Sequence, residues 1–457
     1  MSDQQPGETP SWVDRMPVQA TGVPADAEPK LRRAVAEVMA VQDVTTATQT
    51  MPMRFRGTLT MPSEAAFQRL RPLFEAVGHT PHMRHENGMD VIRALPVVFG
   101  KEPRKVSRLA IILLIATIIS VFFIGMGHSD SMFIDPLTYL TIKITGNPGA
   151  IHDAQGRSIF TEHPELIPTD DQARSAALTG VLYTLALLGI LGTHEMGHYI
   201  MARINKVYTT LPFFIPLPIP PLGTLGAVIV MREPSPNRRV QFDIGIAGPL
   251  AGLIVSIPIM FIGLKLSTIG TTAQFLAKFP ASIRSQMGII SEGQSLLYLG
   301  MKYLVFGQIV PHGNVDVWIH PVAFAAWAGF LVTALNLMPA GQLDGGHVLY
   351  GLFGDRARRL RWPLIGVLAV MAVAGLLREN GIIDLGFGWS GWFLWVLIIY
   401  FLMRNPAPVL DEITGLDDKR KLLGLATLVI FILIFTPTPL VEGPATAIMH
   451  MVQHLLV

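Results

Sequence analysis

The chain has 457 residues, of which half are hydrophobic and 15% are charged, and its mean hydropathy is +0.45. So apolar a composition excludes a single large soluble core and predicts an integral, multi-pass membrane protein. The net charge is only +2 and the basic residues lie in short runs between apolar segments, so nucleic-acid binding has no support. Because the chain has no cysteine, a transition metal would be held by His, Asp or Glu.

Changes in composition along the chain predict an α-helical polytopic membrane protein with a small N-terminal soluble α+β module. The predicted segments are a disordered or partly helical tail (1–50), the soluble module (51–100), a first transmembrane span with an outer loop (101–175), a transmembrane core with two polar motifs (176–354), and C-terminal spans with a tail (355–457).

The module is predicted from its local patterns. The alternation in RFRGTLTM indicates a strand, after which Ser63 is predicted to be the N-cap of a helix that ends at Gly78. Two short strands are then expected on either side of a turn at Asn87 and Gly88.

Three histidines of the module, His79, His82 and His85, are spaced along its second predicted strand. They lack nearby acidic or thiolate partners in the sequence, so we expect exposed strand histidines and no metal site. Nothing in the module indicates chemistry, and the sequence identifies neither a partner for it nor an oligomeric state.

Apolar runs predict about seven transmembrane spans, since about 20 helical residues cross a hydrocarbon core. The predicted spans are 109–126, 176–202, 244–264, 321–338, 362–377, 389–403 and 422–435. Basic residues precede the first span and acidic residues follow it, so the module is expected to face the cytoplasm, in a prokaryotic cytoplasmic membrane.

The pattern HExxH, formed by His194, Glu195 and His198, lies near the end of the second predicted span. Positions four apart share one face of a helix, about 6 Å apart along its axis, so both imidazoles can reach one ion. Zinc accepts neutral histidine nitrogens and lowers the pKa of water to about 7, and the intervening Glu is placed to take the proton.

The alternative is that HExxH is a structural polar cluster, because the pattern also occurs by chance in soluble helices. A charged side chain near the centre of a membrane helix costs about 2.5–3.5 kcal/mol on insertion scales, so such residues usually serve function. The position of the motif in an apolar span therefore favours metal binding.

The segment after HExxH, from Lys206 to about Gly252, is too rich in proline for a helix and too apolar for a solvated loop. A membrane re-entrant β-hairpin or sheet fits it better. An apolar segment that merely packs between helices is an equal alternative from the sequence.

Asp344 is the candidate for the third metal ligand. It lies in NLMPAGQLDGGH, directly after a predicted span that ends on the same side of the membrane as His198. Pro339 and Gly341 break the helix, so irregular backbone lines a water-accessible cavity. Taken alone, LDGG is more often a turn with Asp as a helix cap.

HEMGH together with NLMPAGQLDGG resembles the paired motifs of the site-2 protease family of intramembrane zinc proteases, over residues 176–354. The resemblance implies that His194, His198 and Asp344 bind Zn²⁺ and that Glu195 is the general base. It also implies that Asn336 holds substrate or stabilises the tetrahedral intermediate. GTLGAVIV resembles the family's membrane-inserted strand, which is thought to pair with an unwound substrate helix.

The sequence therefore predicts an intramembrane zinc metalloprotease that hydrolyses a peptide bond in or near the transmembrane segment of membrane-protein substrates, by regulated intramembrane proteolysis. Its expected partners are a transmembrane protein substrate and the lipid bilayer. The alternative is a membrane metal-ion transporter whose intramembrane His and Asp bind cargo. Transporters usually carry repeats with matching broken helices, and neither motif has a second copy.

Overall fold

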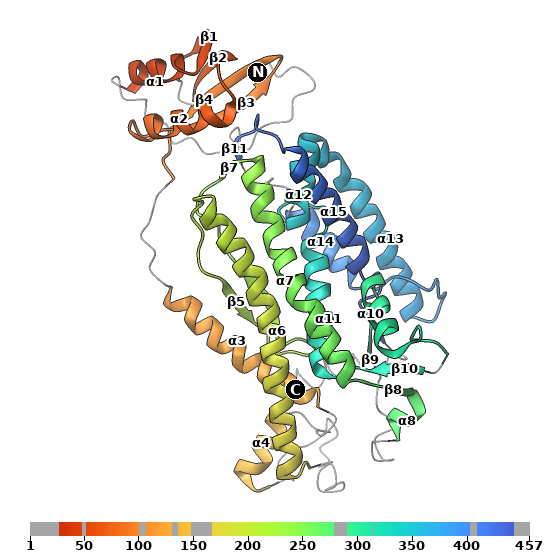
Figure 1. Ribbon diagram of the computed structural model, residues 1–457. Coiled ribbons are helices and arrows are strands. Elements are labelled where there is room, and N and C mark those ends of the chain that lie inside the picture. The colour runs from red at the N-terminus through yellow and green to blue at the C-terminus, as the bar shows by residue number, and fades with distance from the viewer. Residues whose placement is uncertain are drawn as a thin grey trace.

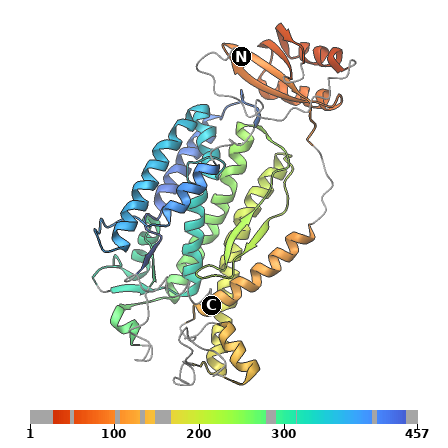
Figure 2. The same cartoon turned by 180° about the vertical axis from the view of Figure 1, so that it is seen from behind.

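A computed structural model describes residues 27–47, 52–99, 107–129, 136–147, 167–277, 290–313, 315–402 and 409–442. The first half of the predicted N-terminal tail and the apolar C-terminal tail lie outside these described residues. A small module of sheet and helices sits at one end of a bundle of long helices (Figures 1 and 2).

The module is a sheet covered on one face by two helices. Its elements are α1 (Ala27–Ala36), β1 (Met39–Thr45), β2 (Met53–Leu59), α2 (Ser63–Glu75), β3 (Thr80–Glu86) and β4 (Met89–Leu95). The core between helices and sheet includes Leu31, Phe55, Leu70 and Phe74. β1 pairs with β2 and α1 contacts α2, so these two elements, which precede residue 51, pack with the rest of the module.

The turn between β3 and β4 is confirmed, with positive φ at both Asn87 and Gly88. The prediction of Ser63 as N-cap is wrong, because Pro62 takes that position and the Ser63 hydroxyl lies 2.7 Å from that of Thr414.

The prediction that the three histidines on and just before β3 are exposed is also wrong for two of them. His79 and His82 are 3% and 0% exposed, whereas His85 is exposed. The physical reason is that β3 is an inner strand of a larger sheet, which the module sequence by itself does not reveal.

Two strands from the core complete this sheet, whose order is β1-β2-β4-β3-β11-β7. Strand β11 (Val409–Asp411) pairs in parallel with β3, and β7 (Ser235–Asn237) pairs in parallel with β11. The module is therefore joined to the helical part by backbone pairing as well as by side-chain contacts.

The bundle is built around three mutually contacting helices, α6, α7 and α11. Its helices are α3 (Arg108–Gly127), α4 (Pro136–Thr145), α6 (Asp170–Ile204), α7 (Arg238–Leu266), α10 (Leu296–Phe306), α11 (Pro321–Asn336), α12 (Asp344–Phe353), the 3₁₀ helix η4 (Gly354–Leu360), α13 (Arg361–Glu379), α14 (Trp392–Leu402) and α15 (Asp418–Ile434). Large buried side chains such as Tyr183, Trp327 and Phe330 fill the space between the central helices.

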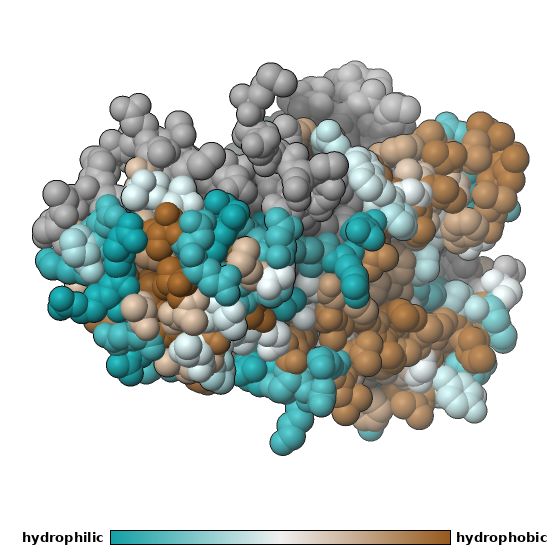
Figure 3. Space-filling model, turned by 90° about the horizontal axis from the view of Figure 1, so that it is seen from above, coloured by the Kyte–Doolittle hydropathy of each residue, from teal (hydrophilic) through white to brown (hydrophobic). Residues whose placement is uncertain are grey.

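Four of the described helices, α3, α6, α7 and α13, are long and apolar enough to cross a membrane. Viewed from the module end, hydrophilic side chains cover the module and hydrophobic ones cover the helices beyond it (Figure 3). The molecule is thus a mostly helical membrane protein, as its composition predicts. The count of seven spans stays a prediction, because α11, α14 and α15 have 16, 11 and 17 residues.

Short strands connect the helices at the end of the bundle away from the module (Figure 1). There β8 (Thr268–Thr271) pairs with β10 (Val315–Trp318), β9 (Ile290–Glu292) pairs with β12 (Leu440–Glu442), and α8 (Thr272–Leu276) follows β8.

The first part of the segment after HExxH forms an antiparallel hairpin of β5 (Phe213–Pro216) and β6 (Thr224–Val228). The prediction that this segment is not helical is wrong from Arg238 onward, where α7 begins. The tip of the hairpin is held by membrane-length helices: the Ser120 hydroxyl of α3 donates to the Gly223 carbonyl, and the Tyr183 hydroxyl of α6 donates to the Leu222 carbonyl. Entry of this hairpin into the bilayer stays a prediction.

Candidate metal centre and catalytic site

The two histidines of HEMGH lie in the last third of α6. This helix begins with a capping box, in which Thr169 and Gln172 satisfy each other's backbone N–H groups, and it continues unbroken for 35 residues. His194 and His198 are one turn apart on its buried face, with exposed fractions of 3% and 6%. Both side chains therefore point into the bundle.

Glycines of α7 make room for the two imidazoles. A Cβ at Gly248 would lie 2.1 Å from Nε2 of His198, and a Cβ at Gly252 would lie 3.2 Å from Cβ of His194. The small residues in FDIGIAGPLAG thus allow α7 to approach the ligand face of α6 closely.

Helix α7 also fixes the orientation of one imidazole. Nδ1 of His198 lies 2.7 Å from the carbonyl oxygen of Ile244, and since a carbonyl only accepts, Nδ1 carries the hydrogen. Nε2 of His198 is then left with a free lone pair, which is the state a metal ligand needs.

Asp344 comes from a separate, broken helix. α11 ends at Asn336, the chain turns at Gly341 with φ of 52°, and α12 begins at Asp344. The turn is tight: a Cβ at Gly345 would lie 1.9 Å from the Leu337 carbonyl oxygen. Helix breaking at this segment, predicted from the proline and glycine residues, is confirmed.

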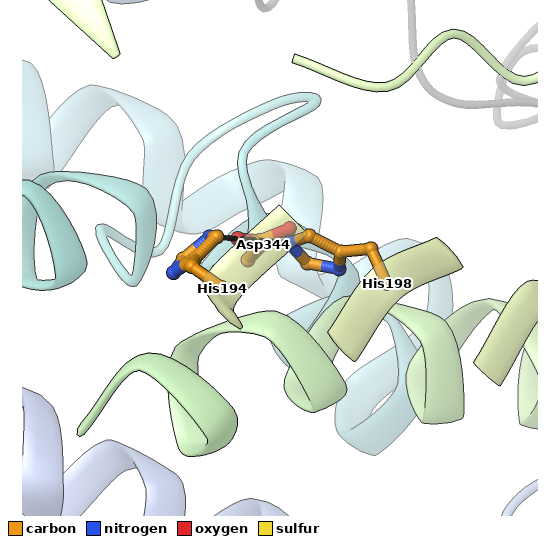
Figure 4. Close-up of side chains that lie close together, drawn as sticks. All are labelled: His194, His198 and Asp344. Atoms are coloured by element: carbon orange, nitrogen blue, oxygen red, sulfur yellow. Dashed lines mark hydrogen bonds and ion pairs between the residues drawn. The ribbon is translucent and has the colours of Figure 1, made fainter. Parts of the chain in front are cut away.

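The three side chains converge (Figure 4). The two Nε2 atoms are 3.2 Å apart, and Oδ2 of Asp344 lies 3.5 Å from Nε2 of His194 and 3.2 Å from Nε2 of His198. Ligands about 2.0–2.2 Å from a tetrahedral ion stand about 3.3–3.6 Å from one another. The donor set and its spacing therefore fit zinc, with one coordination position left open.

Two further predicted residues lie beside this group. Glu195 is buried, and its carboxylate interacts electrostatically with the backbone N–H of Ile229, just after β6. The side-chain nitrogen of Asn336 is 3.2 Å from Nε2 of His194. All five residues singled out in the sequence are thus brought to one place.

Sequence reasoning missed the backbone groups of the site. The Ile244 carbonyl accepts a hydrogen bond from His198, and the Ile229 N–H interacts electrostatically with Glu195. The type of a residue does not show what its backbone groups contact. The glycine spacing of FDIGIAGPLAG was the available signal for Gly248. His320 is the N-cap of α11, and its side chain accepts a hydrogen bond from the Val322 N–H.

The fold and the site define a helical membrane protein with a buried, three-ligand metal centre beside a carboxylate. Residues 182–376 match the model of peptidase family M50, so the chain carries a domain of this family, which is the site-2 protease family. The resemblance seen in the two motifs is thereby confirmed.

Curated relatives agree with this assignment. The chain is 33% identical over 252 residues to the probable zinc metalloprotease EGY1, chloroplastic, of Arabidopsis thaliana, an alignment that covers 55% of this chain and 42% of the relative. It is 30% identical over 268 residues to the probable zinc metalloprotease EGY2, chloroplastic, of the same plant, covering 57% and 42%. No solved structure matches.

The alignments span about two fifths of the length of these relatives. Their names and the ligand group of His194, His198 and Asp344 bear out zinc as the cofactor. Among the residues that the structure describes, this is the one group of three or more His, Asp or Glu side chains close enough to share a metal ion.

Proposed function

We propose that the protein is an intramembrane zinc metalloprotease that hydrolyses a peptide bond in or near the transmembrane segment of a membrane-protein substrate. The observation that carries the proposal is the triangle of ligand atoms from His194, His198 and Asp344, with Glu195 one residue along the same helix. Further support comes from the family match and from the names of the relatives.

A bound zinc ion supplies Lewis-acid chemistry, polarising the substrate carbonyl and making water acidic near neutral pH. The chain's own residues do the rest. The Glu195 carboxylate takes a proton from the attacking water and later gives it to the nitrogen of the leaving amine. The side-chain N–H of Asn336 is near enough to donate to the oxygen on which charge develops.

The hairpin gives a reason why a substrate would lie extended at this site. A peptide bond inside a helix is shielded, so a transmembrane substrate must unwind before water attacks it. An exposed strand edge replaces the lost hydrogen bonds by β-strand addition. β6 ends at Val228, next to the residue that contacts Glu195, so a strand added to this hairpin would run past the general base.

The module and the catalytic site belong to the same end of the bundle in this proposal. α6 runs from the far end to Ile204, and its two histidines lie in the third nearer the module (Figure 1). The basic residues of η4, at the start of α13, are on this end too, which supports a cytoplasmic orientation. A prokaryotic cytoplasmic membrane and regulated intramembrane proteolysis stay proposals, since the relatives are named as chloroplast proteins.

The test uses the full chain in lipid nanodiscs with a tagged single-span membrane protein as substrate. Wild type, Glu195→Gln and Met196→Leu are compared for bound zinc and for cleavage. Met196 is the neighbouring residue and is 37% exposed, so its substitution is the matched control. We expect Glu195→Gln to retain zinc and to cleave about 10²- to 10⁴-fold more slowly, with Met196→Leu close to wild type.

The same preparations distinguish the alternative function. Zinc uptake into proteoliposomes by both wild type and Glu195→Gln, without cleavage by either, would favour the metal-ion transporter. Equal cleavage by wild type and Glu195→Gln would remove Glu195 from the proposed mechanism.

A further inference from the structure

We propose that Arg71 of the module and Glu233 of the core are positioning residues, through which the N-terminal module holds the hairpin against Glu195. This inference rests on the proposed function for its catalytic consequence. Its structural part, contact between the module and the hairpin base, concerns segments that neither motif includes.

The hairpin continues beyond its two strands into a closed base. Thr209 and Met231 form an isolated antiparallel bridge. The N–H of Arg232 donates to the Tyr208 carbonyl at 2.8 Å, and the N–H of Thr210 donates to the Val230 carbonyl at 3.0 Å. The base is therefore a short ladder in which residues 208–210 oppose residues 230–232.

Glu233 closes this ladder and links it to the module. One carboxylate oxygen accepts from the N–H of Tyr208 at 3.1 Å, and the other accepts from the guanidinium of Arg71 at 2.6 Å. Arg71 lies on α2 of the module and also donates to Glu75 of the same helix at 2.7 Å. The Arg71 guanidinium therefore connects the module, through the Glu233 carboxylate, to Tyr208, the first residue of the hairpin base.

Burial makes this link energetically significant. The Glu233 side chain is only 2% exposed and that of Arg71 is 20% exposed. Exposed ion pairs contribute little, but removal of one partner from a buried pair leaves a charge without compensation. The Glu233 carboxylate therefore depends on the module for its counter-charge.

The base of the hairpin leads directly to the catalytic carboxylate. Ile229, whose backbone N–H interacts electrostatically with the Glu195 carboxylate, adjoins Val230 of the ladder and is four residues before Glu233. The other end of the hairpin, the tip, is already held by Ser120 and Tyr183 of the membrane helices. The module therefore holds the base of the hairpin, which is nearer in sequence to Ile229 than the tip is.

The sheet provides a second connection that leads to the same site. The module strand β3 pairs with β11 and β11 pairs with β7, the strand that leads into α7. Asn237 of β7 caps α7 by accepting from the Val240 N–H at 2.9 Å. Two turns later, the Ile244 carbonyl accepts from His198. Both connections therefore link the module to backbone groups that orient the catalytic side chains.

The test compares Arg71→Met, Arg71→Lys and Glu233→Gln with Arg69→Met in the full chain in nanodiscs. Arg69 lies on the same helix α2, and its ion pair with Glu37 is exposed and internal to the module. Three quantities are measured for each variant: hydrogen exchange of the peptide that contains Ile229, bound zinc, and kcat and KM for the membrane substrate.

For Arg71→Met and Glu233→Gln we expect exchange at the Ile229 peptide to be at least about threefold faster than in wild type. Displacement of a catalytic group by about 1 Å can cost 10²-fold in rate, so kcat should fall by about 10- to 100-fold. KM should change by less than about threefold and zinc should remain bound, because no metal ligand is altered. Arg71→Lys should recover part of kcat, and Arg69→Met should match wild type.

Exchange at the Ile229 peptide that is equal in Arg71→Met and Arg69→Met would overturn the inference, as would an unchanged kcat. If Arg71→Met is not recovered in folded form, Glu233→Gln decides the same comparison. If wild type itself cleaves nothing, the proposed function fails, and the exchange measurement alone decides whether the module holds the hairpin.

Discussion

Two buried groups of charged side chains lie at opposite ends of the bundle. Their carboxylates obtain a compensating positive charge in different ways. At the end away from the module, Lys302 is fully buried and donates to Glu292 at 3.2 Å and to Asp316 at 3.3 Å. The Tyr298 hydroxyl also donates to Glu292, at 2.8 Å. This group contains its own cation.

The group near the module consists of His194, His198 and Asp344, and contains no Lys or Arg. The partners of the Asp344 carboxylate among the described residues are His194 and His198, and Nδ1 of His198 is occupied by a carbonyl. A buried carboxylate needs a compensating positive charge. Where Lys302 provides that charge at one end of the bundle, a bound ion provides it at the other.

The largest expected effect is a difference in bound zinc between a variant of each group. Asp344→Ala removes the ligand from α12, so bound zinc should fall from about one per chain to background and cleavage should be lost. Lys302→Met should leave zinc at about one per folded chain. Elemental analysis of the purified variants measures both, and zinc retained by Asp344→Ala would contradict the assignment.

The next effect concerns stability. Lys302→Met leaves the buried Glu292 and the partly exposed Asp316 without their cation, which should lower the free energy of unfolding by about 3–5 kcal/mol. Unfolding in denaturant measures the change. The matched control is Lys421→Met, whose ion pair with Asp418 is exposed, and we expect a change within about 0.5 kcal/mol there.

Removal of zinc should lower the stability of wild type but not that of Asp344→Ala, which lacks a metal ligand. At free zinc about 100-fold above its Kd, the bound ion stabilises the folded state by about 2.7 kcal/mol. A chelator should therefore lower Tm of wild type and leave Tm of Asp344→Ala unchanged. Equal shifts in the two proteins would mean that the chelator acts elsewhere.

The smallest effect tests the fit between helices α6 and α7. A Cβ at Gly248 would meet Nε2 of His198, so Gly248→Ala should weaken zinc affinity by about 10- to 100-fold. Gly189, where a Cβ meets nothing within 4 Å, provides the matched control on α6. Competition with a zinc chelator of known affinity compares Gly248→Ala and Gly189→Ala, and equal affinities would remove the proposed steric role.

The sequence predicted the site better than it predicted the module. The HExxH pattern can be recognised from residue types alone, because helical periodicity places His194 and His198 on one face of the helix. Asp344 needed the second motif, since nothing in local spacing brings residue 344 to residue 198. The pairing of β11 and β7 with the module was not predicted, because three-residue strands more than 300 and 140 residues from β3 show no periodicity of their own.

That missed pairing explains the wrong prediction for His82. Strand β3 appears as an exposed edge when only residues 51–100 are considered, but β11 covers this edge and Glu412 lies 3.2 Å from His82. The hairpin between the motifs was predicted from its composition, whereas its base and the Arg71 contact depend on tertiary packing.

X-ray absorption at the zinc edge of the purified wild-type protein tests the metal centre most directly. Two imidazole nitrogens at about 2.0–2.1 Å, with oxygen ligands completing the shell, is the result expected for His194, His198 and Asp344. A protein purified without zinc despite metal supply, or a shell with an imidazole count other than two, would contradict it.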